Sequence, residues 1–461
     1  MVCVVSFLEV LDRAHSGPVC EVEKWDKHII PTHVKEKLRE HGLTKTCDPA
    51  NSVNTDDTLA DEFWKAGFEF AADTGMLCLD TERTIKFTEE ELKEAIRYQA
   101  PSEITIGEGT EKLVVKARKP EDPQPPLFRS GFGVVSEEHY MELMQAMASL
   151  KIIDLVTPLT TSTLHGRPIL AGSPYESLAG INEAAKVKEA LRRAGRLGAP
   201  IIGVALSPTE YGLLGGYGAL HGYARSDMGL ALAVTELKTS YGLLHKVVRI
   251  QGNGSYIYGG HWSMIGGYVG PPEGAALAAV AAVLLQLLVH RCALISGVIY
   301  DVRYGGNVGR DALWAASVAE QAVSRNTHLL IGGVTSQVSG PCTREVLYEM
   351  AAGALEQVAS GCAVQCGNRS AGGKHVDHIT PLEQKFAAEV SKSCAGMKRT
   401  EANDVVKAIL PRYEEKLRNP PLGKTFMECY NLKTLKPTEE WLSLYREVKR
   451  QLADLGVPLQ A

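Results

Sequence analysis

Eight short apolar segments after residue 126 constrain the fold of this chain more than any other feature. Each is wholly apolar or rich in β-branched residues, as strands buried on both faces of a parallel sheet are. They lie near 132–135, 152–156, 201–206, 230–234, 247–251, 294–302, 329–333 and 362–366. Stretches with a helical pattern separate most of them, so the sequence predicts an α/β fold of the TIM (β/α)8 barrel type.

Helix start signals support this alternation. SPYE at 173–176 and TPLE at 380–383 each combine a capping residue, a proline at the first helical position and a glutamate. The helix after 173–176 is expected to bury Leu178, Ile181 and Ala184 on one face. A doubly wound sheet is the alternative architecture, but the early part of the chain lacks the glycine-rich fingerprint of such folds.

The chain divides into three predicted regions. Residues 1–126 are expected to form a mostly helical extension that ends in the linker KPEDPQPP at 119–126, where four prolines in eight residues exclude helix and central strand. Residues 127–399 form the predicted barrel, and 400–461 predict C-terminal helices packed on it. The extension could cap the barrel or contact another subunit, and the sequence leaves both possibilities open.

Composition excludes several classes of protein. A net charge of −5 without a dense run of Lys or Arg argues against a nucleic-acid partner. The ten cysteines are scattered rather than arranged as a disulfide framework, which is typical of a reducing cytosol. The apolar stretch 274–289 is shorter than the roughly 20 residues of a membrane span, and no basic secretory leader precedes it. We therefore expect a cytoplasmic protein without membrane contact.

Polar and aromatic side chains follow several of the predicted strands, where a TIM barrel builds its site. The candidates follow the third and the fifth to seventh segments, and are Glu210, Tyr256, Tyr258, His261, Trp262, Asp301, Arg303, Tyr304, Asn307 and Gln337. Gln365, Asn368 and Arg369 follow the eighth segment at the same predicted end. Each also has a structural interpretation, because loop residues on a rigid scaffold often only close turns or cap helices.

Two groups of these residues suggest chemistry. Asp301 and Arg303 are two apart, so on an extended segment they share a face, and they predict either an ion pair that orients a charged ligand or a salt bridge at the barrel mouth. Four aromatic residues could form a cage for an alkylated ammonium, or could pack beneath a loop. They are Tyr256, Tyr258, Trp262 and Tyr304.

Metal-ligating spacing is weak in this sequence. His375 and His378 lie three apart in a glycine-flanked loop, and Cys362 and Cys366 lie on a predicted strand too far apart for one zinc ion. We therefore assign no metal site, and His375 and His378 are the best ligands should one exist.

Several ordered segments resemble the monomethylamine:corrinoid methyltransferases of methanogenic archaea. They are DRAHSG at 12–17, KAGFE at 65–69, SPYE at 173–176, AGR at 194–196, ELK at 236–238, GGY at 266–268 and GPCT at 340–343. The longest is GKTFMECYNLKTLKPTEEW at 423–441, which is similar to the C-terminal signature of that family. The resemblance implies a TIM barrel, a hexameric homo-oligomer, and transfer of a methyl group from an amine to the cobalt of a separate corrinoid protein. It implies no cofactor bound tightly by this chain itself.

The sequence departs from the family at the reactive residue. The family places pyrrolysine at the end of the third strand, whereas Ala205 or Leu206 occupies that position here, and the whole chain contains only standard residues. Two glutamates that the family uses to hold pyrrolysine fall near Leu230 and near 260–261, and a glutamine that faces it falls near Val334. The resemblance thus implies a rebuilt site on a retained scaffold.

Arg303, Asn307 and the GPCT segment are retained from the family pattern. We therefore predict a pyrrolysine-free methyltransferase that acts on a methylated amine, with a corrinoid protein as acceptor. A quaternary amine is one candidate donor, because it releases a neutral amine, which is already a good leaving group. The enzyme then mainly has to position the methyl group over the cobalt. In this interpretation Asp301, Arg303 and Glu210 are the catalytic candidates, and the other candidates bind substrate.

Two alternatives stay open. The barrel could have lost catalysis and serve as a binding or assembly protein, because function lives in the site rather than the fold. A metal-assisted transferase that uses His375 and His378 is the other.

Overall fold

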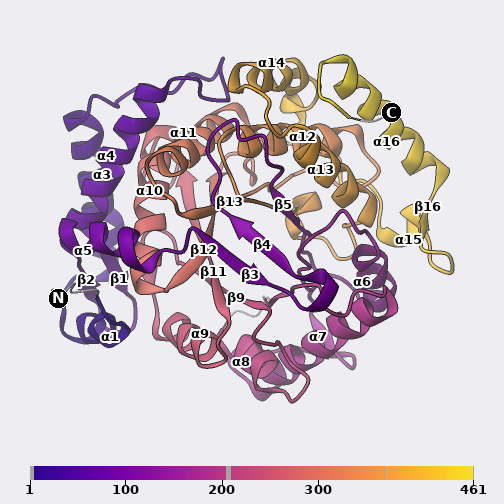
Figure 1. Ribbon diagram of the computed structural model, residues 1–461, viewed down its shortest axis with the longest axis horizontal. Coiled ribbons are helices and arrows are strands. Elements are labelled where there is room, and N and C mark those ends of the chain that lie inside the picture. The colour runs from indigo at the N-terminus through magenta and orange to yellow at the C-terminus, as the bar shows by residue number, and fades with distance from the viewer. Residues whose placement is uncertain (1–4, 204–208, 368, 460–461) are drawn as a thin grey trace.

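Seven parallel strands form one curled sheet at the centre of the molecule (Figure 1). The structure is a computed structural model that describes residues 5–203, 209–367 and 369–459. In order across the sheet, the strands are β5 (Leu127–Arg129), β14 (Val364–Cys366), β13 (Leu330–Val334), β12 (Cys292–Asp301), β11 (Tyr256–Ile265), β9 (Met228–Leu232) and β8 (Ile202–Gly203). Parallel bridges join Arg129 to Leu155 and Val156 to Ile201, so residues 155 and 156 connect the two edges of the sheet. This arrangement is consistent with a TIM barrel.

Helices follow the strands along the chain and surround the sheet (Figure 1). They are α6 (Tyr140–Ala148), α7 (Pro174–Arg193), α8 (Tyr211–Gly218), α9 (Tyr241–Gly252), α10 (Pro272–Val289), α11 (Arg310–Asn326), α12 (Arg344–Ala359) and α13 (Pro381–Ser393). Glu383 completes a capping box with Thr380 at the start of α13, as the sequence predicts. The expected buried face of α7 is wrong in part, because Leu178 and Ile181 are exposed.

The first and fifth predicted strands are misplaced. The first strand is β5, five residues before 132–135, and only Val134 of that segment makes a bridge. Residues 247–251 lie inside α9, where Leu244, Val247 and Ile250 are buried at the three-residue spacing of one helix face. The fifth strand is instead β11, which the sequence analysis treated as a loop.

Two adjacent glycines lower the β-propensity of β11, and both lie at close approaches to neighbouring strands. A Cβ on Gly259 would lie 2.5 Å from the Cys292 sulfur, and a Cβ on Gly260 would lie 2.3 Å from Leu232. Glycine in a strand commonly marks such a close approach, so low β-propensity here reflects packing with β12 and β9 rather than a turn.

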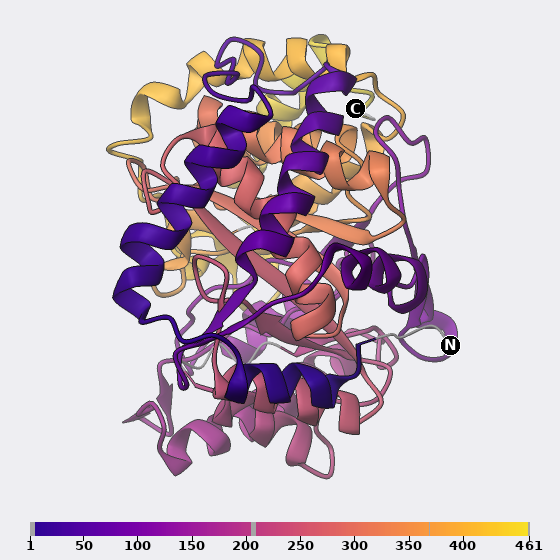
Figure 2. The same ribbon diagram turned by 90° about the vertical axis from the view of Figure 1, so that its left-hand side faces the viewer.

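The N-terminal region covers one side of the sheet and its helices (Figure 2). Its helices are α1 (Phe7–Ser16), α2 (Val22–Lys24), α3 (Ile30–Glu40), α4 (Asp57–Thr74) and α5 (Glu89–Glu94), and α3 and α4 pack against α10. Short strand β1 (Met76–Cys78) pairs with both β2 (Arg83–Ile85) and β10 (Lys238–Thr239). The hairpin β3 (Glu103–Ile106) and β4 (Leu113–Lys116) buries Ile104, Ile106 and Val115 against the apolar inner layer of the sheet.

Helix α10 is buried because of this cover. By length and composition it could cross a membrane, but 94% of it is buried inside the protein. A core helix packed on both the sheet and the N-terminal helices gives the same hydropathy signal.

The C-terminal region packs on the helices that follow β13 and β14. Helix α14 (Arg399–Ile409) contacts α12, and α16 (Glu439–Asp454) contacts both α12 and α13. Between them lie α15 (Phe426–Cys429) and the two-residue strands β15 (Tyr430–Asn431) and β16 (Lys436–Pro437). A second small hairpin, β6 (Thr163–Leu164) with β7 (Arg167–Pro168), precedes α7.

Candidate functional site

Aromatic rings and arginines gather on the inner face of the sheet toward the carboxyl ends of its strands. The rings of Trp262 on β11 and Tyr300 on β12 lie 5.7 Å apart between centroids. The guanidinium carbon of Arg369 lies 5.1 Å from the Trp262 ring and 5.3 Å from the Phe132 ring. Val298, Val334 and Cys366 pack beneath them as a small apolar layer.

Arg129 lies deeper on the same face. Its guanidinium carbon is 5.6 Å from the Phe132 ring and 4.8 Å from the Tyr258 ring, and its Nε donates to Thr157 Oγ1 at 2.7 Å. The side chain is only 2% exposed, and one terminal nitrogen, Nη2, has no hydrogen-bond partner. Tyr258 also pairs its hydroxyl with Ser296.

The β-strand conformation of β11 separates residues that the sequence analysis grouped in one cage. Side chains alternate between the two faces of a strand, and six residues span roughly 20 Å. Tyr258 and Trp262 face inward, whereas Tyr256 is exposed at the opposite end beside Arg291 and Ala293. The prediction that Tyr256 contributes to the cage is therefore wrong.

His261 is also not at this cluster. It faces outward and lines a small cavity of about 30 Å³ between the sheet and α10, with Ala279 and Val283. Burial lowers the pKa of His261 to about 4, so the ring is neutral near pH 7. The assignment of His261 to substrate binding is wrong because a one-residue step along β11 moves a side chain to the other face.

Asp301 and Arg303 form an ion pair just past β12. Asp301 is fully buried and accepts from the Arg303 backbone N–H and from its Nε, both at 2.9 Å. Arg303 is 45% exposed at its side chain and also pairs with Asp311 at 2.5 Å. These hydrogen bonds raise the pKa of Arg303 above its ordinary value. The guanidinium thus has two carboxylate partners within the protein, and its role toward a ligand stays a prediction.

Tyr304 lies on the outer side of this pair, away from the other rings. The Arg303 guanidinium carbon is 5.2 Å from the Tyr304 ring, and both residues line a surface recess with Glu414. Tyr304 therefore does not complete a cage with Trp262.

Asn307 and Gln337 hold the backbone around the cluster. Asn307 donates to the Val334 carbonyl at 2.6 Å and accepts from the Ser336 N–H at 2.7 Å, which joins the segments after β12 and β13. Gln337 accepts from the Arg369 backbone N–H at 2.9 Å. Both residues lie where predicted, and their observed contacts fix loops.

Glu210 lies at the start of α8, beside α9. A Cβ on Gly242 would lie 2.6 Å from the Glu210 carboxylate. Burial lowers the pKa of Lys246 on α9, and the negative charge of Glu210 partly offsets this effect. Ala205 and Leu206, the positions assigned to pyrrolysine, fall outside the described residues.

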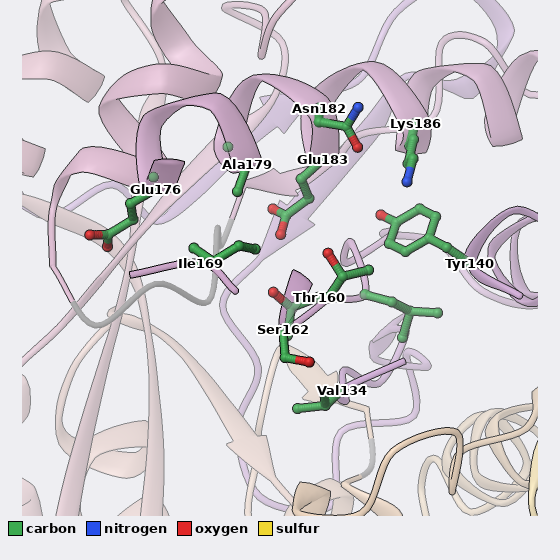
Figure 3. A pocket seen from close by; sticks show the side chains of 14 residues that line it. Val134, Tyr140, Thr160, Ser162, Ile169, Glu176, Ala179, Asn182, Glu183 and Lys186 are labelled. Carbon is green, nitrogen blue, oxygen red and sulfur yellow. The ribbon is translucent and has the colours of Figure 1, made fainter. Parts of the chain in front are cut away.

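A separate pocket of about 220 Å³ lies between α7 and the segment after residue 156 (Figure 3). Figure 3 shows Glu183 reaching from α7 toward Thr160, with Tyr140 and Lys186 at one end. Glu183 accepts from Tyr223, while Glu176 accepts from the Thr209 N–H at 3.0 Å. None of the predicted site residues lines this pocket.

His375 and His378 face one another with ring centroids 5.7 Å apart. His378 Nδ1 lies 2.8 Å from the Val376 carbonyl oxygen. Within residues 5–203, 209–367 and 369–459, no group of three or more His, Cys, Asp or Glu side chains is placed to hold a metal ion.

Arg129, Phe132 and Tyr300 were not among the site residues predicted from the sequence, and Arg369 was predicted at the carboxyl ends of the strands without a role. Arg129 lies in an otherwise apolar strand, and a charged residue in such a strand is the signal that could have identified it. Burial of a charge is unfavourable unless the charge is paired, so a buried arginine indicates a structural or functional partner.

Comparisons with known proteins agree over almost the whole chain. The family model described as Monomethylamine methyltransferase MtmB matches residues 5–457. Proteins of that name from Methanosarcina mazei and Methanosarcina barkeri are 31% and 30% identical, each over 97% of this chain and 97% of the relative. Crystal structures of the Methanosarcina barkeri enzyme and of a hydroxylamine MtmB complex superpose with a TM-score of 0.93, at 29% identity and 98% coverage of both chains. The resemblance inferred from sequence segments is confirmed, and the chain belongs to the monomethylamine methyltransferase MtmB family.

Proposed function

We propose that this protein transfers a methyl group from a methylated amine to the cobalt of a corrinoid protein. The observation that carries the proposal is the family match, which spans residues 5–457. The solved relatives share the arrangement of strands and helices over 98% of both chains. Neither comparison supports the alternative of a binding protein without catalysis.

We infer that the sheet closes into an eight-stranded TIM barrel, with residues 155 and 156 as its second strand. The two bridges on either side of these residues support closure. The substrate then binds at the carboxyl ends of the strands, where Trp262, Tyr300 and Arg369 lie.

The reaction proceeds without pyrrolysine in this proposal. The sequence contains only standard residues, and 204–208 reads VALSP. In methyl transfer the carbon–nitrogen bond breaks with its electron pair moving to nitrogen, and reduced cobalt on the partner protein supplies the pair for the new carbon–cobalt bond. The described residues supply no covalent amine carrier here, so this chain contributes by holding the amine and excluding water.

The corrinoid belongs to the partner protein, and we propose that this chain binds no cofactor or metal tightly. A cytoplasmic location and a homo-oligomer, with the hexamer implied by resemblance, also remain proposals. The nine described cysteines are free, which supports a reducing compartment.

The test is an assay with the purified protein, a corrinoid protein reduced to cobalt(I), and a panel of methylated amines. Formation of the methyl–cobalt species is followed by absorbance for monomethylamine, dimethylamine, trimethylamine and quaternary amines. Transfer from any one of them supports the proposal. No transfer from any amine, with the protein folded and the cobalt reduced, would overturn it in favour of a binding role.

A further inference from the structure

Two arginines on the inner face of the sheet lack any carboxylate partner. Neither Arg129 nor Arg369 forms an ion pair with a described residue, whereas 29 other pairs are present. The residues outside the described ranges, 1–4, 204–208, 368 and 460–461, contain no Asp or Glu. The protein therefore has no side-chain carboxylate available for either guanidinium.

Arg369 is the accessible member of this pair. Its guanidinium donates no hydrogen bond to the described residues and packs against the rings of Phe132 and Trp262. Its Nε is buried without an acceptor, and burial lowers the pKa of the side chain. Arg129 lies behind the same Phe132 ring, so both guanidinium carbons are within 5.6 Å of one ring centroid.

Two other buried cations of this protein have carboxylate partners. Lys238 contacts Asp26 at 2.6 Å, and Arg196 contacts Glu111 at 2.8 Å. Arg118 is buried without a carboxylate, but it donates four hydrogen bonds to backbone carbonyl oxygens. Lys246 is also largely buried without an ion pair among the described residues, but the charges of Glu210 and Glu176 act to raise its pKa, whereas no carboxylate acts in this way on Arg129 or Arg369.

An arginine stays charged when buried, and a buried charge without a partner is strongly unfavourable. A guanidinium presents a planar fork of donors that matches a carboxylate in two parallel hydrogen bonds. A bound anionic group would satisfy Arg369 and reduce the positive potential that Arg129 adds behind it.

We propose that the substrate is a methylated amine that also carries a carboxylate, which pairs with Arg369. This inference rests on the proposed methyl transfer and specifies its substrate class. A methylammonium ion without a carboxylate would be repelled by two guanidinium groups here. The Trp262 and Phe132 rings, which could otherwise bind a cation, already contact Arg369. A zwitterion brings the missing negative charge with it and leaves its methylated nitrogen for the partner's cobalt.

The first experiment measures binding to the full chain by calorimetry, without the corrinoid protein. Matched ligands differ only in the carboxylate: N,N,N-trimethylglycine against tetramethylammonium, and N,N-dimethylglycine against trimethylamine. We expect the carboxylated member of at least one pair to bind about 100-fold more tightly, as a desolvated charge pair allows. Equal affinity within both pairs would overturn the inference.

Variants identify the residue responsible. Arg369→Gln should abolish the preference for the carboxylated ligand, and Arg369→Lys, which keeps the charge but loses the fork, should retain part of it. Arg446→Gln is the matched control, because Arg446 is exposed and pairs only with Glu439. If Arg369→Gln folds by circular dichroism and keeps the full preference, the assignment is wrong. If it does not fold, Arg369→Lys decides: a reduced preference supports the assignment, and an unchanged preference overturns it.

Other sources of the anion give different results. Competition by phosphate or chloride, together with no preference between matched ligands, would show that an inorganic anion occupies the site and would overturn the proposal. An effect of Arg369→Gln on the KM for the corrinoid protein alone would assign the anion to that partner, again against the proposal. Selective binding without any transfer would overturn the proposed reaction but support the carboxylate site. Transfer without selectivity would support the reaction and overturn the carboxylate site.

Discussion

Replacing Asp301 with Asn distinguishes a structural ion pair from a catalytic one. Asp301 is fully buried, and its Oδ2 accepts from Arg303 Nη2 at 2.5 Å while its Oδ1 accepts from the Arg303 N–H and Nε. Asn keeps the Oδ1 bonds but places an amide N–H₂ against the guanidinium. We expect the substrate to be held elsewhere, so the loss should fall on stability.

Two hydrogen bonds reach Oδ2, but the bond from Nε at 3.1 Å is shared with Oδ1, which Asn keeps. The magnitude therefore follows mainly from the charge-assisted bond from Nη2. Such a bond contributes about 1.5–3 kcal/mol. Because Arg303 is 45% exposed and keeps Asp311 as a second partner, we place the loss near the middle of that range, at about 2 kcal/mol. Asp311→Asn is the matched control: it removes the more exposed carboxylate of the same arginine and should cost about 0.5 kcal/mol.

The assay is urea unfolding followed by tryptophan fluorescence, paired with the methyl-transfer rate per folded molecule. The expected result for Asp301→Asn is a lower urea midpoint with transfer within about threefold of wild type, which is roughly 0.7 kcal/mol in barrier height. An unchanged midpoint with transfer lost would refute this reasoning and restore Asp301 and Arg303 as catalytic residues.

Three further outcomes are expected. Because burial holds the pKa of His261 near 4, below its usual 6.5, the contribution of His261 to the free energy of unfolding should fall by up to about 3 kcal/mol as pH falls from 6.5 to 4, and the difference in urea midpoint between wild type and His261→Gln should change accordingly. Burial and the neighbouring Glu320 raise the pKa of Glu356 well above 4.5, so the contribution of Glu356 has the opposite sign and falls as pH rises above about 5, and Glu356→Gln should gain stability relative to wild type in that direction. Leu178 and Ile181 are 52% and 40% exposed on α7, as expected of a face that contacts another subunit. Changing both to Lys should therefore reduce the mass of the oligomer measured by sedimentation, and an unchanged mass would place the interface elsewhere.

The regular alternation of apolar segments and helix starts was enough to predict six of the eight strand positions approximately. Strands near 294–302, 329–333 and 362–366 overlap β12, β13 and β14. These strands are mostly apolar and largely buried, which is the pattern that identifies a strand in a parallel sheet. Of the two misplaced strands, β11 begins YIYGGHW, where glycines stand beside polar and aromatic residues, so its position depends on close packing with neighbouring strands that no local pattern records.

The candidate site was harder to predict because side-chain direction depends on the exact register. The list of residues near the fifth and sixth strands contained Trp262, which faces inward, and His261, which faces outward. A sequence interpretation that treats β11 as a loop cannot separate them, since only a strand imposes the two-residue alternation. The aromatic cage failed for this reason, although one of its members lies at the carboxyl ends of the strands.

The two unpaired arginines show how the order of strands brings distant segments together. Arg129 lies at the end of β5 and pairs in register with Cys366 at the end of β14, and Arg369 follows only three residues later. The first and last strands of the chain's β/α series are neighbours, so two charges 240 positions apart come to flank Phe132. An acidic residue near either one in sequence would not have paired with it unless it also ended a neighbouring strand. No strand end therefore places a carboxylate beside either arginine, and the carboxyl ends of the strands are where a TIM barrel binds its ligand.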